Sequence, residues 1–135
     1  MKILLLLTLS IFTFASDFNG IWVGNGAAKS GDFKVSCPDV EMRFHVTDTL
    51  FILRGGHYNC EGFSAEYPYF EFQINQGVLY DGSKEVGSIS DRLINIFSKE
   101  EGFNLDLVLE NGELSMFETW EDGDEYFKVI AKLKK

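Results

Sequence analysis

The sequence predicts an all-β fold, an antiparallel up-and-down meander of about eight to ten short strands closed into a small barrel. Apolar and polar residues alternate with a period of two over most of the chain after residue 17. Short turn sequences such as Asn111-Gly112 and Asp122-Gly123 separate these alternating runs, and no helical pattern precedes Tyr126. A meander of this length would expose two long unpaired edges, so we expect it to close.

The last third of the chain gives the clearest strand pairings. If Asn111-Gly112 and Asp122-Gly123 are both two-residue turns, three strands lie in register. The predicted pairs are Leu109–Leu114, Leu107–Met116, Leu105–Glu118, Phe103–Trp120, Trp120–Glu125, Glu118–Phe127, Met116–Val129 and Leu114–Ala131. One face of these strands is therefore apolar and contains one carboxylate, Glu118.

The same pattern continues upstream, where residues 18–23 form a predicted first strand and the Gly-rich residues 24–32 a predicted flexible loop. Further strands are expected around residues 33–37, 42–46, 50–54, 57–60, 67–74, 78–80, 86–90 and 93–98. With turns at Asp48-Thr49 and Gly55-Gly56, the pairs are Val46–Phe51, Phe44–Leu53, Leu53–Tyr58 and Phe51–Cys60. His45 and His57 then point outward, away from any interior site.

Residues 1–15 are predicted to be a secretory signal peptide, and residues 16–135 a single barrel domain. Lys2 precedes an apolar run, and Thr13-Phe14-Ala15 places small residues at −3 and −1 of a cut before Ser16. An uncleaved anchor is the alternative, but the run is short for a membrane span. We expect an exported protein, periplasmic or secreted, whose mature form does not span the membrane. The lack of an N-x-[ST] sequon favours a bacterial source.

The charge of the chain restricts its partners. Without Lys2 there are 11 basic and 21 acidic residues, a net charge of −10. Nucleic acids and anionic membrane surfaces select Lys and Arg, so we expect neither as a partner. A basic protein partner or a cation is compatible with this charge, as is a simple role in solubility.

The two cysteines, Cys37 and Cys60, predict one disulfide, because an even count in an exported chain is typical of a bridge. The pairings around Gly55-Gly56 conflict with it, since they leave Cys37 far from Cys60. The alternative is a zinc site of Cys37, Cys60, His45 and His57, whose spacing lacks any paired ligand motif.

Asp17-Phe18-Asn19-Gly20-Ile21-Trp22 resembles the Gly-x-Trp entry to the first strand of lipocalins and their calycin relatives, with Gly20 and Trp22 at the matching positions. The chain is also similar to small exported bacterial barrels of unassigned function with two cysteines. The calycin resemblance implies a small-molecule binder in which a late basic residue packs over the tryptophan. Lys132 or Lys134 would take that role here. The mid-chain Thr-Asp-Tyr signature of many lipocalins is missing.

Five residues of the apolar face are candidate ligand contacts: Glu118, Trp120, Phe103, Met116 and Phe127. A carboxylate among apolar neighbours needs a partner, which would be a ligand amine or hydroxyl, or else an internal arginine such as Arg43, Arg54 or Arg92. A rim position wet enough to need no partner is the third possibility. Trp120 and Phe103 would lie beside Glu118 at the rim of the barrel.

Other features give weaker signals. Tyr67, Tyr69 and Phe70 form an aromatic cluster around Pro68, either an exposed patch or a packed bend. The acidic run 121–125 is a candidate calcium loop or a contact for a basic protein, although it lacks the spacing of known calcium loops. No nucleophile or paired acid–base group is evident, so we expect no enzyme, no metal and no cofactor.

Two functions follow from the sequence. The first is an exported barrel that binds an apolar or amphipathic small molecule in its interior. The alternative is a protein-interaction barrel, such as a hydrolase inhibitor or envelope-maintenance protein, acting through acidic and aromatic loops. An open cavity reached past Trp120 favours the first, and an interior filled by side chains favours the second.

Overall fold

The computed structural model describes residues 16–135, so the predicted signal peptide lies outside the described residues. These residues form eleven β-strands and, over the same range, no helix. The strands are β1 (Gly20–Ser30), β2 (Phe33–Val46), β3 (Leu50–Cys60), β4 (Phe63–Tyr67), β5 (Phe70–Asn75), β6 (Val78–Asp81), β7 (Lys84–Ile89), β8 (Leu93–Ser98), β9 (Phe103–Glu110), β10 (Glu113–Asp122) and β11 (Glu125–Lys134). Within residues 16–135 no helix is long and apolar enough to cross a membrane.

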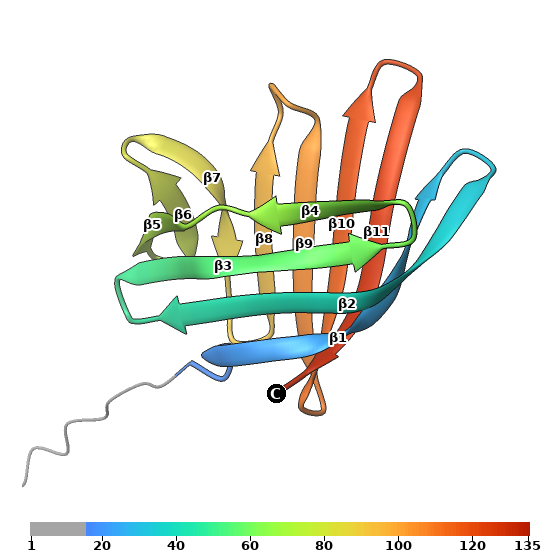
Figure 1. Ribbon diagram of the computed structural model, residues 1–135. Coiled ribbons are helices and arrows are strands. Elements are labelled where there is room, and N and C mark those ends of the chain that lie inside the picture. The colour runs from blue at the N-terminus through green and yellow to red at the C-terminus, as the bar shows by residue number, and fades with distance from the viewer. Residues whose placement is uncertain (1–15) are drawn as a thin grey trace, which may run out of the picture.

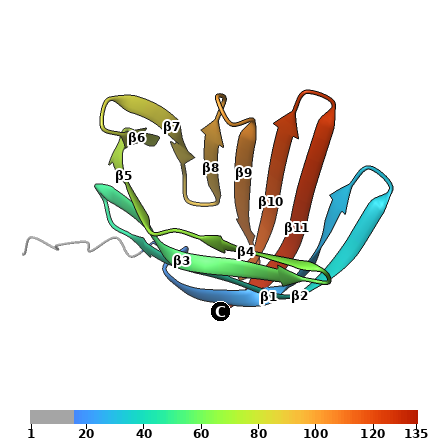
Figure 2. The ribbon, with the colours of Figure 1, turned by 45° about the horizontal axis from the view of Figure 1, so that its top comes forward.

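The strands form one antiparallel meander that closes on itself, as predicted. β1 pairs with both β2 and β11, and β2 also pairs with β3, which completes a ring of ten strands. β4 lies outside this ring, because β3 pairs with β5 through its first half and with β4 through its second half. Strands β1 to β4 form a front layer that crosses strands β8 to β11 behind it (Figure 1, and turned in Figure 2).

The core lies between these two layers. Apart from bulges, the residues alternate so that every second side chain points inward, and the buried inner ones are apolar except for Glu118. Fully buried inner side chains include Met42, Phe51, Leu53, Leu105, Leu107, Leu114, Met116 and Leu133. Contact between the layers therefore fills the middle of the barrel with side chains.

The first C-terminal hairpin has the predicted register, and the second is shifted by two residues. Asn111 and Gly112 both have positive φ, and Leu105 pairs with Glu118 and Phe103 with Trp120. The second turn is Gly123-Asp124, so Glu118 pairs with Val129 and Trp120 with Phe127. Of its two central residues only Gly123 has positive φ, which suits a turn with glycine first. An even shift keeps every side chain on its predicted face.

The predicted turn at Gly55-Gly56 is wrong, because β3 runs straight through it. Val46–Phe51 and Phe44–Leu53 pair as predicted, but a bulge follows and Gly56 pairs with Met42. A Cβ on Gly56 would come within 2.5 Å of the Glu41 carbonyl oxygen, so the glycine permits close strand approach. Leu53 therefore pairs with Phe70 instead of Tyr58.

The uninterrupted β3 explains the disulfide that the predicted turn obstructed. Asp39 pairs with Asn59, which brings the middle of β2 against the end of β3, and Cys37 is bonded to Cys60. The bridge closes a sequence separation of 23 residues. It confirms the predicted pairing, and it excludes the zinc alternative because both sulfurs are used.

The predicted loop at residues 24–32 is also wrong, since β1 continues to Ser30. Small residues in this segment allow β1 to lie directly against β11 at the barrel seam. A Cβ on Gly24 would approach the Lys132 carbonyl oxygen to 2.0 Å, and one on Gly26 the Ile130 carbonyl oxygen to 2.0 Å. The glycines are therefore required by packing between neighbouring backbones rather than by flexibility.

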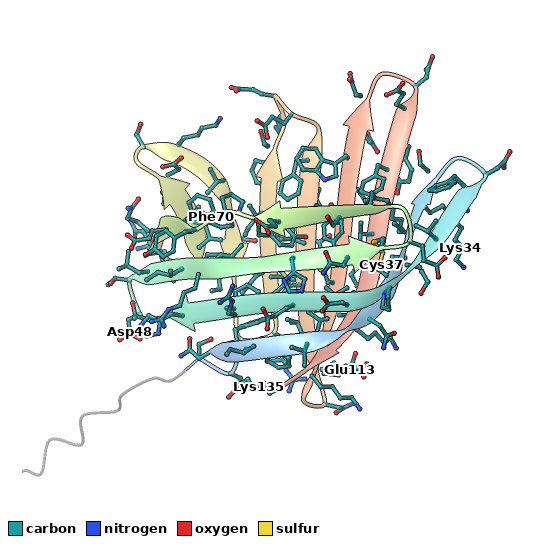
Figure 3. All side chains as sticks on the ribbon, viewed as in Figure 1. Lys34, Cys37, Asp48, Phe70, Glu113 and Lys135 are labelled. Carbon is teal, nitrogen blue, oxygen red and sulfur yellow. A yellow bond between two sulfur atoms is a disulfide. The ribbon has the colours of Figure 1, made fainter. Side chains whose placement is uncertain are left out.

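Trp22 lies at the lower end of the barrel, buried, and its indole Nε1 donates to the Phe18 carbonyl at 2.8 Å. Lys135 Nζ lies 5.1 Å from the centre of the Trp22 ring, so the predicted cation is present but comes from another residue. Lys132 and Lys134 alternate with the buried Ala131 and Leu133 and must point outward. Figure 3 shows Lys135 at this end of the molecule.

Removal of the disulfide tests how the β2–β3 pair is held. We expect Cys37→Ala/Cys60→Ala to lower the free energy of unfolding by about 3 kcal/mol, because the unfolded chain regains the freedom of the cross-linked loop. Urea unfolding followed by circular dichroism measures this. A reducing agent should destabilise the parent protein and leave the variant unchanged. A variant as stable as the parent would contradict the expectation.

Replacement of Lys135 tests the contact with Trp22. We expect Lys135→Met to lower the free energy of unfolding by about 0.5–1 kcal/mol, the range for an exposed cation on an aromatic face. Lys132→Met removes the same charge from the outer face, where Lys132 lies 3.6 Å from Glu113. We expect this variant to lose less free energy of unfolding than Lys135→Met. Urea unfolding of both variants measures the two losses. A larger loss in Lys132→Met than in Lys135→Met would contradict a stabilising contact between Lys135 and Trp22.

Candidate ligand-binding mouth

Glu118 is the centre of the candidate site. It lies on the inner face of β10 between Leu105 of β9 and Val129 of β11, and it is 1% exposed. Its neighbours on the inner face of the same strand are Met116 below and Trp120 above. The prediction of one carboxylate on an apolar face is therefore confirmed, and this position is buried rather than a wet rim.

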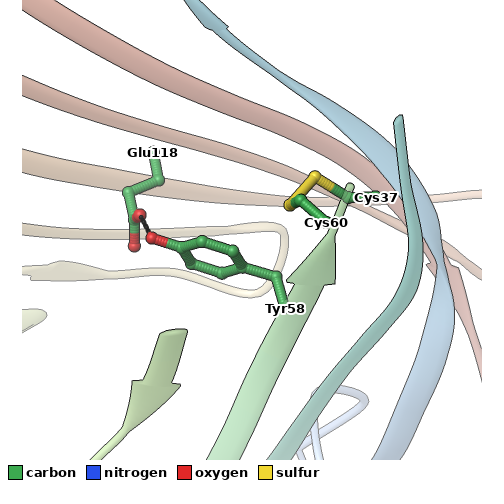
Figure 4. The surroundings of a disulfide bond; sticks show 4 residues. All are labelled: Cys37, Tyr58, Cys60 and Glu118. Atoms are coloured by element: carbon green, nitrogen blue, oxygen red, sulfur yellow. Dashed lines mark hydrogen bonds between the residues drawn. A yellow bond between two sulfur atoms is a disulfide. The ribbon is translucent and has the colours of Figure 1, made fainter. Parts of the chain in front are cut away.

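Three neutral side chains donate hydrogen bonds to Glu118, and none of them is an arginine. Tyr58 Oη donates to Oε2 at 2.9 Å, and Trp120 Nε1 donates to the same oxygen at 3.2 Å. Tyr67 Oη donates to Oε1 at 2.5 Å. All three partners donate, which is the arrangement required by an ionised carboxylate, an acceptor only. Figure 4 shows the Tyr58 ring directed at Glu118, beside the disulfide.

The two tyrosines reach Glu118 from the opposite layer of the barrel. Tyr58 is on β3 and Tyr67 on β4, strands that cross in front of β10 (Figure 1). Sequence reasoning placed Tyr58 on the inner face but did not pair it with Glu118, because no local pattern links residues 60 positions apart. The predicted arginine partners are wrong, since the polar contacts of Glu118 come from tyrosine and tryptophan.

Burial and the carboxylate act together on the tyrosines. Burial raises the pKa of Tyr67 well above its ordinary value, and the charge of Glu118 and the hydrogen bond to it raise it further. The pKa of Tyr58 is raised for the same causes in the same order. Both phenols therefore remain protonated donors at neutral pH.

Aromatic rings surround this polar centre at the upper end of the barrel. Phe103 and Trp120 pack as a tilted pair with ring centres 4.6 Å apart, and Trp120 is 37% exposed. Phe127 meets Phe63 edge to face at 5.6 Å. Phe103, Phe127 and Phe63 are half-buried, so the aromatic surface is only partly covered.

We call this end of the barrel the mouth, defined by residues 30–31, 99–102 and 120–127. A hollow of about 1090 Å³ lies here, open to solvent, with Trp120 and Phe127 in its wall. Its lining contains six acidic residues and one lysine: Glu100, Glu101, Glu121, Asp122, Asp124, Glu125 and Lys99. The mouth thus combines an aromatic wall with an acidic rim.

The opposite end of the barrel, which we call the base, has a different character. A hollow of about 890 Å³ there is lined by Trp22, Val46, Ile74, Ile89 and Leu109. Its charged lining residues are of both signs: Asp17, Asp48, Asp91, Arg92 and Lys135. The Asn19 side-chain amide donates to the Val46 carbonyl oxygen and accepts from the Val46 backbone N–H. These two hydrogen bonds hold the segment before β1 against the end of β2.

The five predicted contact residues are gathered near the mouth, though at different depths. Trp120, Phe103 and Phe127 lie around it, and Glu118 lies one step deeper. Met116 is completely buried below Glu118, so only movement of the layers would expose it. Phe127 pairs with Trp120 and not with Glu118 as predicted, because of the shifted turn.

Several other predicted features lie away from the mouth. His57 Nε2 lies 3.0 Å from Asp39 Oδ2 on the outer face, and His45 alternates with buried neighbours. Tyr69 is 59% exposed, whereas Tyr67 turns inward, so the predicted aromatic cluster is split at the break between β4 and β5, where Pro68 and Tyr69 belong to neither strand. Across residues 16–135 no three His, Cys, Asp or Glu side chains are placed to hold a metal ion.

No protein-family model and no curated protein sequence matches the chain. Among solved structures, the chain is similar to zebrafish ileal bile acid-binding protein complexed with cholic acid. The TM-score is 0.50 at 14% identity, and the match covers 89% of this chain and 99% of that one. At this identity the likeness concerns the fold alone. It confirms the expected lipocalin- or calycin-like barrel.

Alkaline unfolding tests the tyrosine–carboxylate network. Because Tyr58 and Tyr67 have raised pKa values in the folded protein, their contribution is full below about pH 10, the ordinary tyrosine pKa, and declines as the pH rises above it. We expect the free energy of unfolding in urea to fall less steeply above pH ~10 in Tyr58→Phe/Tyr67→Phe than in the parent.

Tyr126→Phe is the control for this comparison, because Tyr126 is 40% exposed and its hydroxyl lies outside the network. We expect this variant to keep the alkaline slope of the parent. Identical slopes in all three proteins would show that the buried phenols do not contribute in this way.

Proposed function

We propose that this protein is an exported binding protein that holds an apolar or amphipathic small molecule at the mouth of its barrel. The observation that carries the proposal is the partly exposed Trp120–Phe103 pair beside a hollow of about 1090 Å³. Aromatic surface in a concave site with a few polar groups beneath it suits recognition of such molecules.

The packing of the core decides how deep such a molecule would reach. Below Glu118, the side chains of Met116, Leu107 and Phe51 are fully buried and fill the middle of the barrel, between the mouth and the hollow at the base. A ligand therefore occupies the upper interior, with its apolar part against Phe127 and Trp120, and does not thread through the barrel.

The fold supports a binding function by analogy only. The similar zebrafish structure is of a bile acid-binding protein, and its barrel covers nearly all of this chain. Shared architecture does not transfer a ligand, so the chemistry of the mouth must decide which molecule fits.

We also propose export and a non-enzymatic role. The Cys37–Cys60 disulfide suits an oxidising compartment, in agreement with the leader predicted for residues 1–15. The buried polar cluster consists of a carboxylate with two protonated tyrosines and an indole, and it contains no nucleophile paired with a base. A binding role needs no such pair.

A protein-interaction barrel is the second candidate, favoured by the filled middle of the barrel. The acidic turn at residues 121–125 protrudes at the mouth and would meet a basic surface, as in an inhibitor of a hydrolase or an envelope-maintenance protein. This candidate needs no ligand in the barrel, and the two proposals differ in that respect.

Binding of an uncharged amphiphile tests the first proposal. We expect dodecyl maltoside, kept below its micelle concentration, to bind one per chain, and Trp120→Ala to weaken binding by at least about tenfold through loss of aromatic burial. Isothermal titration calorimetry and native mass spectrometry measure this. Tyr69→Ala, which removes an exposed aromatic outside the mouth, should bind like the parent.

Failure would take a clear form. If neither uncharged nor charged amphiphiles bind, or if Trp120→Ala binds as tightly as the parent, the mouth is not a ligand site. The protein-interaction candidate would then stand alone.

A further inference from the structure

We propose that the molecule bound at the mouth is a cationic amphiphile, an organic ammonium whose charged group lies on the exposed face of Trp120. This inference rests on the proposed ligand-binding function and names the class of ligand. It follows from three features of the mouth that all favour a positive charge: a buried carboxylate, an aromatic wall and an acidic rim.

The first feature is Glu118, a carboxylate whose hydrogen bonds come from neutral groups. Tyr58, Tyr67 and Trp120 satisfy its oxygens but leave its negative charge uncompensated. Among residues 16–135, no Lys or Arg nitrogen lies within 4 Å of the Glu118 carboxylate; the Lys and Arg ion pairs all use other acidic residues. In an interior of low dielectric that charge extends its field towards the mouth instead of being screened.

The second feature is the position of Trp120 between Glu118 and solvent. Its indole N–H donates to Glu118, while the ring is 37% exposed and lines the mouth. Donation to an anion leaves the ring face richer in negative charge, and a cation over a tryptophan face is attracted by the ring quadrupole. The ammonium therefore does not need to touch Glu118, which is 1% exposed.

The third feature is the charge of the rim. Six acidic residues and Lys99 line the mouth, so the local field attracts cations and repels anions. The base differs, because there Arg92 and Lys135 face three aspartates. The two ends of the barrel therefore select differently, and an anionic amphiphile is disfavoured at the mouth.

An organic cation fits this site better than a metal ion. No three His, Cys, Asp or Glu side chains in the described part of the chain are arranged to hold a metal. Phe103 and Phe127 offer no metal ligands but do offer apolar surface for an alkyl or ring portion. An ammonium attached to an apolar body uses both kinds of contact at once.

The test compares three amphiphiles of equal chain length and different charge, each below its micelle concentration. They are dodecyltrimethylammonium, dodecyl maltoside and dodecyl sulfate, titrated into the mature disulfide-bonded protein by calorimetry at low and moderate salt. We expect the ammonium to bind at least about tenfold more tightly than the maltoside. The sulfate should bind more weakly than the maltoside, and salt should reduce both differences.

Variants assign the charge preference to the mouth. Glu118→Gln should lower the ratio of ammonium affinity to maltoside affinity, because it removes the buried negative charge. If that variant fails to fold, Glu121→Gln/Glu125→Gln on the exposed rim should still lower the ratio of ammonium affinity to maltoside affinity. Asp48→Asn/Asp91→Asn makes the same change in charge at the base and should leave the ratio as in the parent.

The outcomes separate this inference from the function on which it rests. Equal binding of ammonium and maltoside would overturn the cation preference and leave a neutral binding site intact. Loss of the preference in the base variant instead of the rim variant would overturn the assignment to the mouth. Absence of binding by all three amphiphiles would overturn the proposed function itself.

Discussion

The hydrogen bonds from Tyr58 and Tyr67 to Glu118 are the contacts on which the arrangement of the two layers depends. A carboxylate that is 1% exposed is tolerable only if donors replace the water it has lost. Those donors come from β3 and β4, while Glu118 belongs to β10. Satisfying this one acid therefore joins the front layer to the back layer at a specific point, in addition to the apolar packing between them.

The Tyr58–Glu118–Tyr67 cluster also separates the open mouth from the filled middle of the barrel. Below it, the side chains of both layers interdigitate and are excluded from water. Above it, strands β8 to β11 extend past β4 (Figure 2). The inner aromatic residues Phe103, Trp120 and Phe127 are only partly covered there. A barrel of this size has room for side chains or for one small ligand, and here the interior is divided between the two uses.

This protein shares its fold with a bile acid-binding barrel, but its acidic mouth favours a ligand of positive charge. The neighbour shares the architecture at 14% identity, which leaves the inner side chains free to differ. In this chain the inner polar centre is an acid and the rim carries six more. Function on a shared barrel is decided by such side chains and not by the strands that carry them.

The sequence by itself determined the strand class, the closure, the faces and the disulfide, because these depend on local periodicity, turn chemistry and cysteine count. Leu107 and Val129 are buried as their alternation predicts, and Asn111-Gly112 forms the expected turn. The alternation also shows, in hindsight, that Lys132 points outward and that Lys135 is the residue able to reach Trp22.

Only the tertiary structure decided the partners of Glu118, the continuity of β1 and β3, and how charges are divided between the two ends of the barrel. Gly56 lies within a strand rather than in a turn because it must fit against the Glu41 carbonyl of a neighbouring strand, and no local pattern contains that neighbour. Tyr67 meets Glu118 across 51 residues for the same reason. Contacts between distant segments arise from how the layers cross, and local sequence does not encode the crossing.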